Sequence, residues 1–180
     1  MNVPRKIRLG SRSSPLALIQ TDEVLSLLRP QFPDVEFEAI QVSTGGDRDK
    51  DALLSTLERG TFVKDIETAL LNGEIDFAVH SAKDLAPELA AGLTALPVGQ
   101  RQDARDVLVS GSGLPLSQLP AGTRLGTSSP RRTAQIKVVR PDIELLPIRG
   151  NVGTRLQKAN GTVYDGVVLA AAGLARLGLL

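Results

Sequence analysis

Short strand-like and helix-like segments alternate along the whole 180-residue chain, and this alternation restricts its fold more than any other feature. The strand-like segments are runs of β-branched or alternating apolar residues, whereas the helix-like segments repeat apolar residues every three or four positions. We expect strands at residues 7–12, 35–43, 76–81, 93–98, 107–110, 124–127, 143–148 and 166–170. We expect helices at residues 15–30, 61–72, 130–139 and 151–158 and after residue 170. This order predicts an α/β architecture with mainly parallel sheets, and no tandem repeat is evident in the sequence.

The balance of charge changes near residue 100. Residues 1–100 contain 10 Lys or Arg and 15 Asp or Glu, whereas residues 101–180 contain 11 and 5. This change predicts two domains, residues 1–99 and 104–180, with a hinge at residues 99–104. Arg accounts for 15 of the 21 basic residues, and its planar guanidinium group matches the two oxygens of a carboxylate or a phosphate.

Composition argues against several classes of function. The chain has no cysteine and one histidine, which argues against thiol catalysis, disulfides and metal sites built on Cys or His. Aromatic residues make up 3% of the chain and the net charge is +1, which argues against a nucleic-acid-binding module. The N-terminus lacks the apolar region of a signal peptide, and the most apolar stretch, residues 166–180, is shorter than the about 20 residues that span a bilayer. We therefore expect a cytoplasmic protein that binds no metal, nucleic acid or membrane.

Four segments at the expected carboxyl ends of strands contain cationic side chains: residues 10–15, 80–84, 126–132 and 149–155. Ligands of open α/β sheets bind beyond these strand ends. In the third segment, Arg131 and Arg132 fall in the first turn of an expected helix, where the helix dipole disfavours a cation unless an anion binds among the free N–H groups. Alternatively, the two arginines reach solvent or a nearby Asp. Four cationic junctions together favour a site for a polyanion.

Asp84 is a carboxylate within this positive field, directly after Lys83. Nearby cations keep such a group ionised, so it can stabilise a positive charge that develops on a ligand or orient an N–H donor. It can equally cap a helix over residues 85–88, because Asp is a favoured N-cap residue. His80 lies within an apolar strand, which favours a structural role. The glycine-rich segments match neither the P-loop nor the dinucleotide-binding fingerprint, which argues against a nucleotide enzyme.

Five strings spread over the chain point to one family. They are Gly-Ser-Arg-Ser-Ser-Pro-Leu-Ala-Leu (10–18), Val-His-Ser-Ala-Lys-Asp (79–84), Gly-Thr-Ser-Ser-Pro-Arg-Arg (126–132), Arg-Gly-Asn-Val-Gly-Thr-Arg-Leu (149–156) and Ala-Ala-Gly-Leu-Ala-Arg-Leu-Gly-Leu (171–179). In this order and spacing the chain resembles the porphobilinogen deaminases, also called hydroxymethylbilane synthases. The resemblance implies a transferase that condenses four porphobilinogen units head to tail, losing ammonia at each step, in tetrapyrrole (haem and chlorophyll) biosynthesis. It also implies two periplasmic-binding-protein-like (type II) domains with a cleft between them.

The resemblance also implies roles for individual residues. Asp84 would be the catalytic carboxylate, which contacts pyrrole N–H groups and stabilises the cation left when ammonia departs. The carboxylates of cofactor and substrate would be bound by Arg12, Ser14, Lys83, Thr127, Ser128, Ser129, Arg131, Arg132, Arg149, Gly150, Asn151 and Arg155. Arg59 and Phe62 would lie at the cleft, by a flexible flap over residues 45–60.

The most consequential departure of the chain from the family concerns attachment of the cofactor. Members attach a dipyrromethane cofactor through a thioether to a cysteine in a third domain, whereas this sequence has no cysteine and ends at Leu180. We therefore expect the two N-terminal domains only, with the second domain truncated and the isolated chain inactive or impaired. Apolar surface around residues 167–180 would then be uncovered and favour self-association. The alternative function is a non-catalytic two-domain module that binds a small polycarboxylate.

Overall fold

The computed structural model describes residues 6–42, 61–159 and 161–180, with the side chains of residues 61 and 62 outside this description. The chain divides into two compact units, residues 1–100 (the first unit) and residues 101–180 (the second unit). The division falls within residues 99–104, and the function of this segment as a hinge stays a prediction. The expected flap over residues 45–60 lies outside the described residues. No helix within the described ranges is long and apolar enough to cross a membrane.

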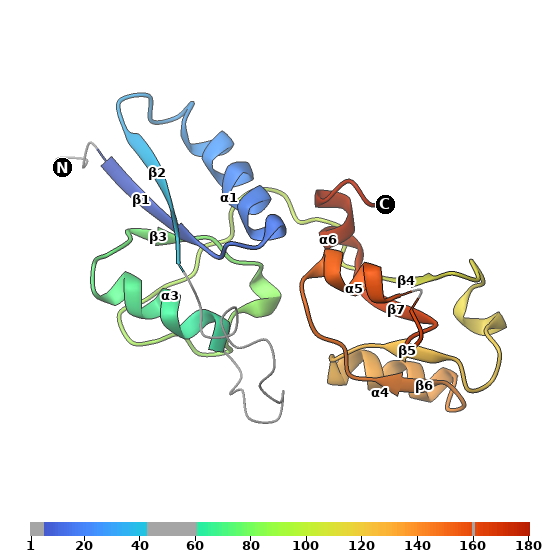
Figure 1. Cartoon of the computed structure of the whole chain (residues 1–180). Helices are drawn as coiled ribbons and strands as arrows, with labels where there is room; N and C mark the ends of the chain where they lie inside the picture. Colours follow the sequence, from blue (N-terminus) through green and yellow to red (C-terminus); the bar gives the residue numbers. More distant parts are fainter. Residues whose placement is uncertain (1–5, 43–60, 160) are drawn as a thin grey trace. The chain divides into compact units, whose positions relative to one another are not determined.

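In the described part of the first unit, three parallel strands form a sheet in the order β2-β1-β3 (Figure 1). The elements are β1 (Lys6–Ser11), α1 (Pro15–Leu28), β2 (Glu36–Gln41), α3 (Thr61–Leu71), β3 (Phe77–Ala78) and the 3-10 helix η1 (Ala82–Asp84). Helix α1 contacts β1, and helix α3 contacts β3. The core of the unit packs Ile66 and Ala69 of α3 against Ile75. The predicted alternation of parallel strands and helices is confirmed here.

Local sequence signals begin and end the helices of this unit. Ser14 caps α1 by accepting a hydrogen bond from the Ala17 N–H at 3.3 Å, and Pro15 occupies the first helical turn, where its missing N–H costs nothing. Helix α3 ends shortly before Gly73, whose φ of +67° is a conformation that glycine adopts without strain. Both helices therefore form where the sequence predicts them.

One predicted strand of the first unit is absent, and another is shorter than predicted. The strand expected over 76–81 is reduced to Phe77–Ala78, and Phe77 is 53% exposed rather than buried. It is the edge strand of the described sheet, with β1 on one side, so less of it is paired and covered than a central strand would be. Residues 93–98 form no strand, and Leu96 is 76% exposed. An apolar run predicts a strand only where a neighbouring strand is available to pair with it.

In the described part of the second unit, four strands form a sheet in the order β4-β7-β5-β6. The elements are β4 (Asp106–Ser110), the 3-10 helix η2 (Leu116–Gln118), β5 (Arg124–Gly126), α4 (Pro130–Val139), β6 (Glu144–Leu146), α5 (Val152–Lys158), β7 (Gly166–Ala170) and α6 (Ala171–Arg176). Strand β4 runs antiparallel to β7, and the other pairs are parallel. The sheets of the chain are therefore mainly parallel, as predicted.

Strand β7 is covered on both faces. Val168 packs in one cluster with Ile136 of α4, whereas Val167 and Leu169 pack in another with Leu174 of α6. The prediction of uncovered apolar surface is therefore wrong for residues 167–174, because β7 lies between β4 and β5 rather than at an edge. Exposed apolar side chains remain at the two terminal residues, Leu179 and Leu180.

The two units contain the same βαβαβ arrangement, although no repeat was evident in the sequence. Strand order β6-β5-β7 of the second unit matches β2-β1-β3 of the first. Arg8 and Arg124, the equivalent residues of β1 and β5, bind Asp76 and Asp165 through the same three contacts, from the main-chain N–H, Nε and Nη2. The register agrees as well, since Arg8 pairs with Glu38 and Arg124 with Glu144. A repeat of this kind is visible only once the strand pairing is known.

Candidate functional site

The candidate site residues of the first unit follow the carboxyl ends of β1 and β3. Strand β1 leads into Arg12 and Ser14, and β3 leads into His80, Lys83 and Asp84. The two strand ends lie side by side, because the Val79 N–H donates to the Gly10 carbonyl at 3.0 Å. Parallel pairing therefore brings two junctions that are about 70 residues apart in sequence to one edge of the sheet.

Asp84 is the last residue of η1 and does not cap a helix. Its own N–H donates to the Ser81 carbonyl at 2.9 Å, and the Leu85 N–H donates back to the Ala82 carbonyl. The alternative of a helix over residues 85–88 is wrong, because η1 closes a single turn and the chain then bends without forming a helix. Lys83 Nζ lies 2.6 Å from Asp84 Oδ1, and both side chains are substantially exposed. A charge-assisted hydrogen bond therefore holds the carboxylate beside its neighbour, where a ligand can reach it.

The pKa of His80 depends on its burial and on nearby charges. Burial lowers the pKa of the imidazole and Arg12 lowers it further, whereas Asp84 and Glu67 raise it, and the net pKa lies below its usual value. The imidazole is therefore neutral at pH 7.

Two residues near this strand end were missed from the sequence. Glu67 of α3 has its Oε1 buried without a hydrogen-bond partner among the described residues. Its position four residues after the buried Val63 was the available signal, because i and i+4 lie on the same helix face. Gln20 of α1 accepts a hydrogen bond from Ser81 Oγ at 3.0 Å, and so ties α1 to the segment that leads into Asp84.

In the second unit, the hydroxyl groups after β5 bind the backbone. Ser128 Oγ donates to the Ile148 carbonyl at 2.6 Å and accepts from the Ile148 N–H at 2.9 Å. Thr127 Oγ1 accepts from the Ser129 N–H at 3.2 Å, and Ser129 Oγ caps α4 by accepting from the Arg132 N–H at 3.4 Å. These three predicted ligand-binding residues thus shape the β5–α4 junction.

Arg131 and Arg132 share one carboxylate. Arg131 Nη2 lies 2.8 Å from Asp106 Oδ2, and Arg132 Nη2 lies 2.6 Å from Asp106 Oδ1. Arg132 also donates to the Val168 carbonyl at 2.9 Å, and its side chain is 13% exposed against 59% for Arg131. The alternative left open by the sequence, a nearby Asp, is therefore present, and it leaves Arg131 the more accessible of the two.

The junction before α5 is built around a glycine. Gly150 has a φ of +109°, and a Cβ at this position would lie 2.7 Å from Cβ of Thr154. Asn151 caps α5 by accepting from the Thr154 N–H at 2.9 Å, and Arg155 Nε donates to the Gly150 carbonyl at 2.8 Å. Arg149 is half-buried just before this turn. A tight turn therefore gathers two arginines at the carboxyl end of β6.

The remaining predicted residues are not placed. Arg59 lies outside the described residues, and the side chain of Phe62, at the start of α3, is also outside them. Within the described ranges, no group of three His, Asp or Glu side chains could hold a metal ion.

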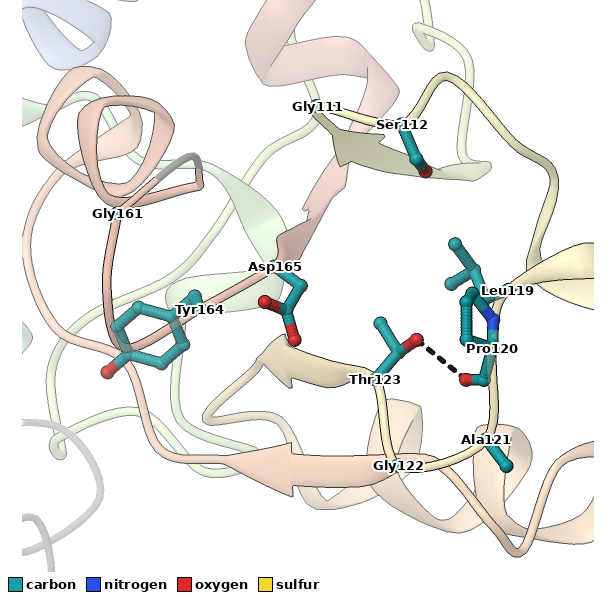
Figure 2. Close-up of a pocket in the computed structure, with 10 residues that line it drawn as sticks. All are labelled: Gly111, Ser112, Leu119, Pro120, Ala121, Gly122, Thr123, Gly161, Tyr164 and Asp165. Carbon is teal, nitrogen blue, oxygen red and sulfur yellow. Dashed lines mark hydrogen bonds between the residues drawn. The ribbon is translucent and has the colours of Figure 1, made fainter.

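A cavity on the described surface of the second unit is lined by none of these residues (Figure 2). It measures about 560 Å³ and lies next to the amino ends of β5 and β7, where Gly122, Thr123 and Asp165 contribute to its wall. Its polar groups are already bound: Thr123 Oγ1 donates to the Pro120 carbonyl at 2.6 Å, and Asp165 pairs with Arg124. Because ligands of such sheets bind at the carboxyl ends, we do not assign a ligand to this cavity.

Comparison with known proteins decides the family. Residues 7–180 match the family model described as "Porphobilinogen deaminase, dipyromethane cofactor binding domain". The chain belongs to the porphobilinogen deaminase family. The resemblance predicted from the five strings is thereby confirmed.

Relatives with this name match nearly the whole chain. The chain is 51% identical to the porphobilinogen deaminase of Shouchella clausii over 175 residues, which cover 97% of this chain and 56% of that protein. It is 49% identical over 176 residues to the enzyme of Syntrophomonas wolfei (97% and 58%) and 46% identical over 173 residues to that of Syntrophus aciditrophicus (96% and 56%). The chain thus spans somewhat more than half the length of these deaminases.

A solved structure supports the predicted fold class. The periplasmic aliphatic sulphonate binding protein SsuA of Escherichia coli superposes with a TM-score of 0.52 at 14% identity, over 98% of this chain and 55% of that protein. At this identity the match shows the fold alone, a periplasmic-binding-protein-like α/β fold with mainly parallel sheets. The chain therefore has the fold that its sequence predicts.

Proposed function

We propose that this chain provides the two α/β units with which a porphobilinogen deaminase binds and condenses its substrate. The reaction joins four porphobilinogen units head to tail, losing ammonia at each step, and yields hydroxymethylbilane for tetrapyrrole biosynthesis in the cytoplasm. Family membership supports the reaction class. The single observation that carries the proposal is Asp84, an accessible carboxylate with a cation at 2.6 Å, at the carboxyl end of β3.

Asp84 would act on the charge that develops as the substrate's C–N bond breaks. The protonated amino group leaves as ammonia with the electron pair of the C–N bond, and the positive charge then spreads over the pyrrole and the methylene carbon. A carboxylate next to this carbon stabilises the transition state more than the ground state, which is the requirement for catalysis. The Lys83 ammonium lies 2.6 Å from Asp84 Oδ1, and this contact holds the carboxylate at the strand end.

The carboxylates of the substrate would be bound by the cations of the strand ends. Each porphobilinogen carries an acetate and a propionate, so the growing chain gains two negative charges with every unit. We propose Arg12, Ser14 and Lys83 in the first unit and Arg131, Arg149 and Arg155 in the second as the direct ligands of these groups. Arg132, Thr127, Ser128, Ser129, Gly150 and Asn151 would act by shaping the junctions, which their observed contacts support.

A dipyrromethane cofactor fits these residues in part. The same arginine and serine donors suit its carboxylates, and when bound it would supply the pyrrole end onto which new units are added. A thioether to the cofactor cannot be made by these 180 residues, because they contain no cysteine. We therefore assign the chain a role in binding the cofactor and none in its covalent attachment.

The alternative is a non-catalytic module that binds a polycarboxylate, which the missing cysteine favours. Incubation with porphobilinogen, followed by an ammonia assay and intact mass, separates the two. Ammonia release that Asp84→Asn abolishes supports catalysis, and Asp142→Asn, which removes another exposed ion-paired carboxylate, is the matched control. Binding of hydroxymethylbilane without any ammonia release would support the module instead. If the chain neither releases ammonia nor binds hydroxymethylbilane, the proposed function is refuted.

A further inference from the structure

Asp106, which the sequence did not single out, is the described carboxylate closest to the arginines of α4. It is the first residue of β4, 25 residues before Arg131, and the side chain is 23% exposed. Each oxygen accepts a hydrogen bond from a different guanidinium group, Oδ2 from Arg131 and Oδ1 from Arg132. Burial raises the pKa of this carboxyl, but the hydrogen bonds from Arg132 and Arg131 outweigh it, and the net pKa lies below its usual value. Asp106 is therefore ionised at pH 7.

The two arginines are held in different ways. Arg132 has contacts to Asp106 and to the Val168 carbonyl and is almost buried. Arg131 has one contact to Asp106 and one to Gln135 Oε1 at 3.3 Å, and more than half of its side chain is exposed. A guanidinium group has five N–H donors, so Arg131 keeps several for a ligand. Two cations and one anion leave this cluster with a single uncompensated positive charge, which one carboxylate neutralises.

We propose that Asp106 is a positioning residue: it anchors Arg132 as a support and orients Arg131, so that this junction binds one ligand carboxylate through Arg131. The inference rests on the proposed function for the identity of the ligand, a pyrrole carboxylate, but not for the geometry of the cluster. The proposed junction, which binds one carboxylate, differs from a site in which the adjacent arginines bind two carboxylates independently.

Removal of the Asp106 charge distinguishes positioning from simple neutralisation, because the two predict opposite signs. If Asp106 only neutralised the arginines, Asp106→Asn would tighten binding, by about fourfold for one unit charge at about 5 Å in water. If it positions Arg131, the freed side chain must lose its rotamer entropy on binding, which corresponds to as much as about 30-fold in affinity. We therefore expect Asp106→Asn to weaken binding by about 5- to 30-fold.

The experiment is calorimetric titration of the 180-residue chain with porphobilinogen. Asp106→Glu should recover part of the lost affinity. Arg131→Leu should reduce the affinity less in the Asp106→Asn background than in the unmodified chain. The matched control is Asp165→Asn, which breaks the Arg124–Asp165 ion pair beside the amino end of β5 and should leave affinity unchanged. Thermal unfolding of each variant checks that the second unit is folded. Unchanged or tighter binding by Asp106→Asn overturns the inference and leaves the proposed function intact.

A second probe keeps the two conclusions separable. Sodium propionate, a simple monocarboxylate, should shift the ¹⁵N-edited NMR signal of the Arg131 Nε–H in the unmodified chain and shift it less in Asp106→Asn. If porphobilinogen does not bind but propionate behaves in this way, the proposed function fails and the inference stands. If propionate causes no shift, or the same shift in both proteins, Asp106 does not position Arg131 for a carboxylate.

Discussion

Ser128 joins two of the candidate ligand-binding junctions, and its removal gives the sharpest test of how the second unit is built. Its hydroxyl donates to the Ile148 carbonyl at 2.6 Å and accepts from the Ile148 N–H at 2.9 Å, and Ile148 itself is 1% exposed. Ser128→Ala leaves both buried backbone groups without this partner. At about 1 kcal/mol for each lost hydrogen bond, the free energy of unfolding should fall by about 2 kcal/mol. For a unit of 80 residues this corresponds to a fall in Tm of about 10 °C.

Tyrosine fluorescence is the appropriate assay. Tyr164 is the only tyrosine of the chain, which has no tryptophan, so the signal reports on the second unit alone. Ser112→Ala is the matched control, because its hydroxyl bonds are exposed and their loss should change stability by less than about 0.5 kcal/mol. Equal urea midpoints for Ser128→Ala and Ser112→Ala would refute the argument. Loss of porphobilinogen affinity at unchanged stability would show instead that Ser128 contacts the ligand.

Three further predictions follow from single residues. Arg124 lowers the pKa of Asp165 to about 2 from 3.8, so its ion pair stabilises the fold above pH 4 and this contribution is lost as pH falls towards 2. In Asp165→Asn the urea midpoint should therefore change less between pH 4 and pH 2 than in the unmodified chain. The difference in the free energy of unfolding should be no more than about 1 kcal/mol, because the pair is exposed. The pKa of His80 lies below 6.5 in the folded chain, so the unfolded chain binds the proton better and stability should fall as pH drops from 7 to 5. The only histidine C2–H signal in the NMR spectrum gives this pKa directly, and a value above 6.5 would contradict the prediction. Gly150→Ala should lower stability by about 1–3 kcal/mol, because its φ is positive and the added Cβ meets Thr154; an unchanged tyrosine unfolding midpoint would show that the turn relaxes freely.

Local signals explain why so much of the fold could be predicted. Ser14, Ser129 and Asn151 each cap a helix where the sequence predicts its start, because a cap depends on residues only three positions apart. Residues 93–98 were mistaken for a strand because pairing depends on distant segments that the run itself does not encode. The internal repeat went unseen for the same reason.

The candidate site could be predicted in its location but only partly in its contacts. Arg12, Asp84 and Arg131 lie at strand ends, which follows from the alternation of strands and helices alone. Asp106, which binds both arginines of α4, was only an unnamed alternative, because a contact across 25 residues depends on the antiparallel pairing of β4 with β7. Glu67 was missed because residues 61–72 were predicted as a helix with no role given to this side chain.

The repeat separates what the scaffold requires from what function requires. Leu9 pairs with Phe77 in the first unit, and the equivalent Leu125 pairs with Gly166 in the second. Counting on from these pairs, η1 and α6 begin at equivalent alanines, Ala82 and Ala171, and Asp84 corresponds to Gly173, which is buried in α6. The same scaffold therefore closes this strand end with a buried glycine in one unit and with an exposed carboxylate paired to a lysine in the other. Since the second unit closes this strand end without a carboxylate, we take the presence of Asp84 as support for the chemistry proposed for it.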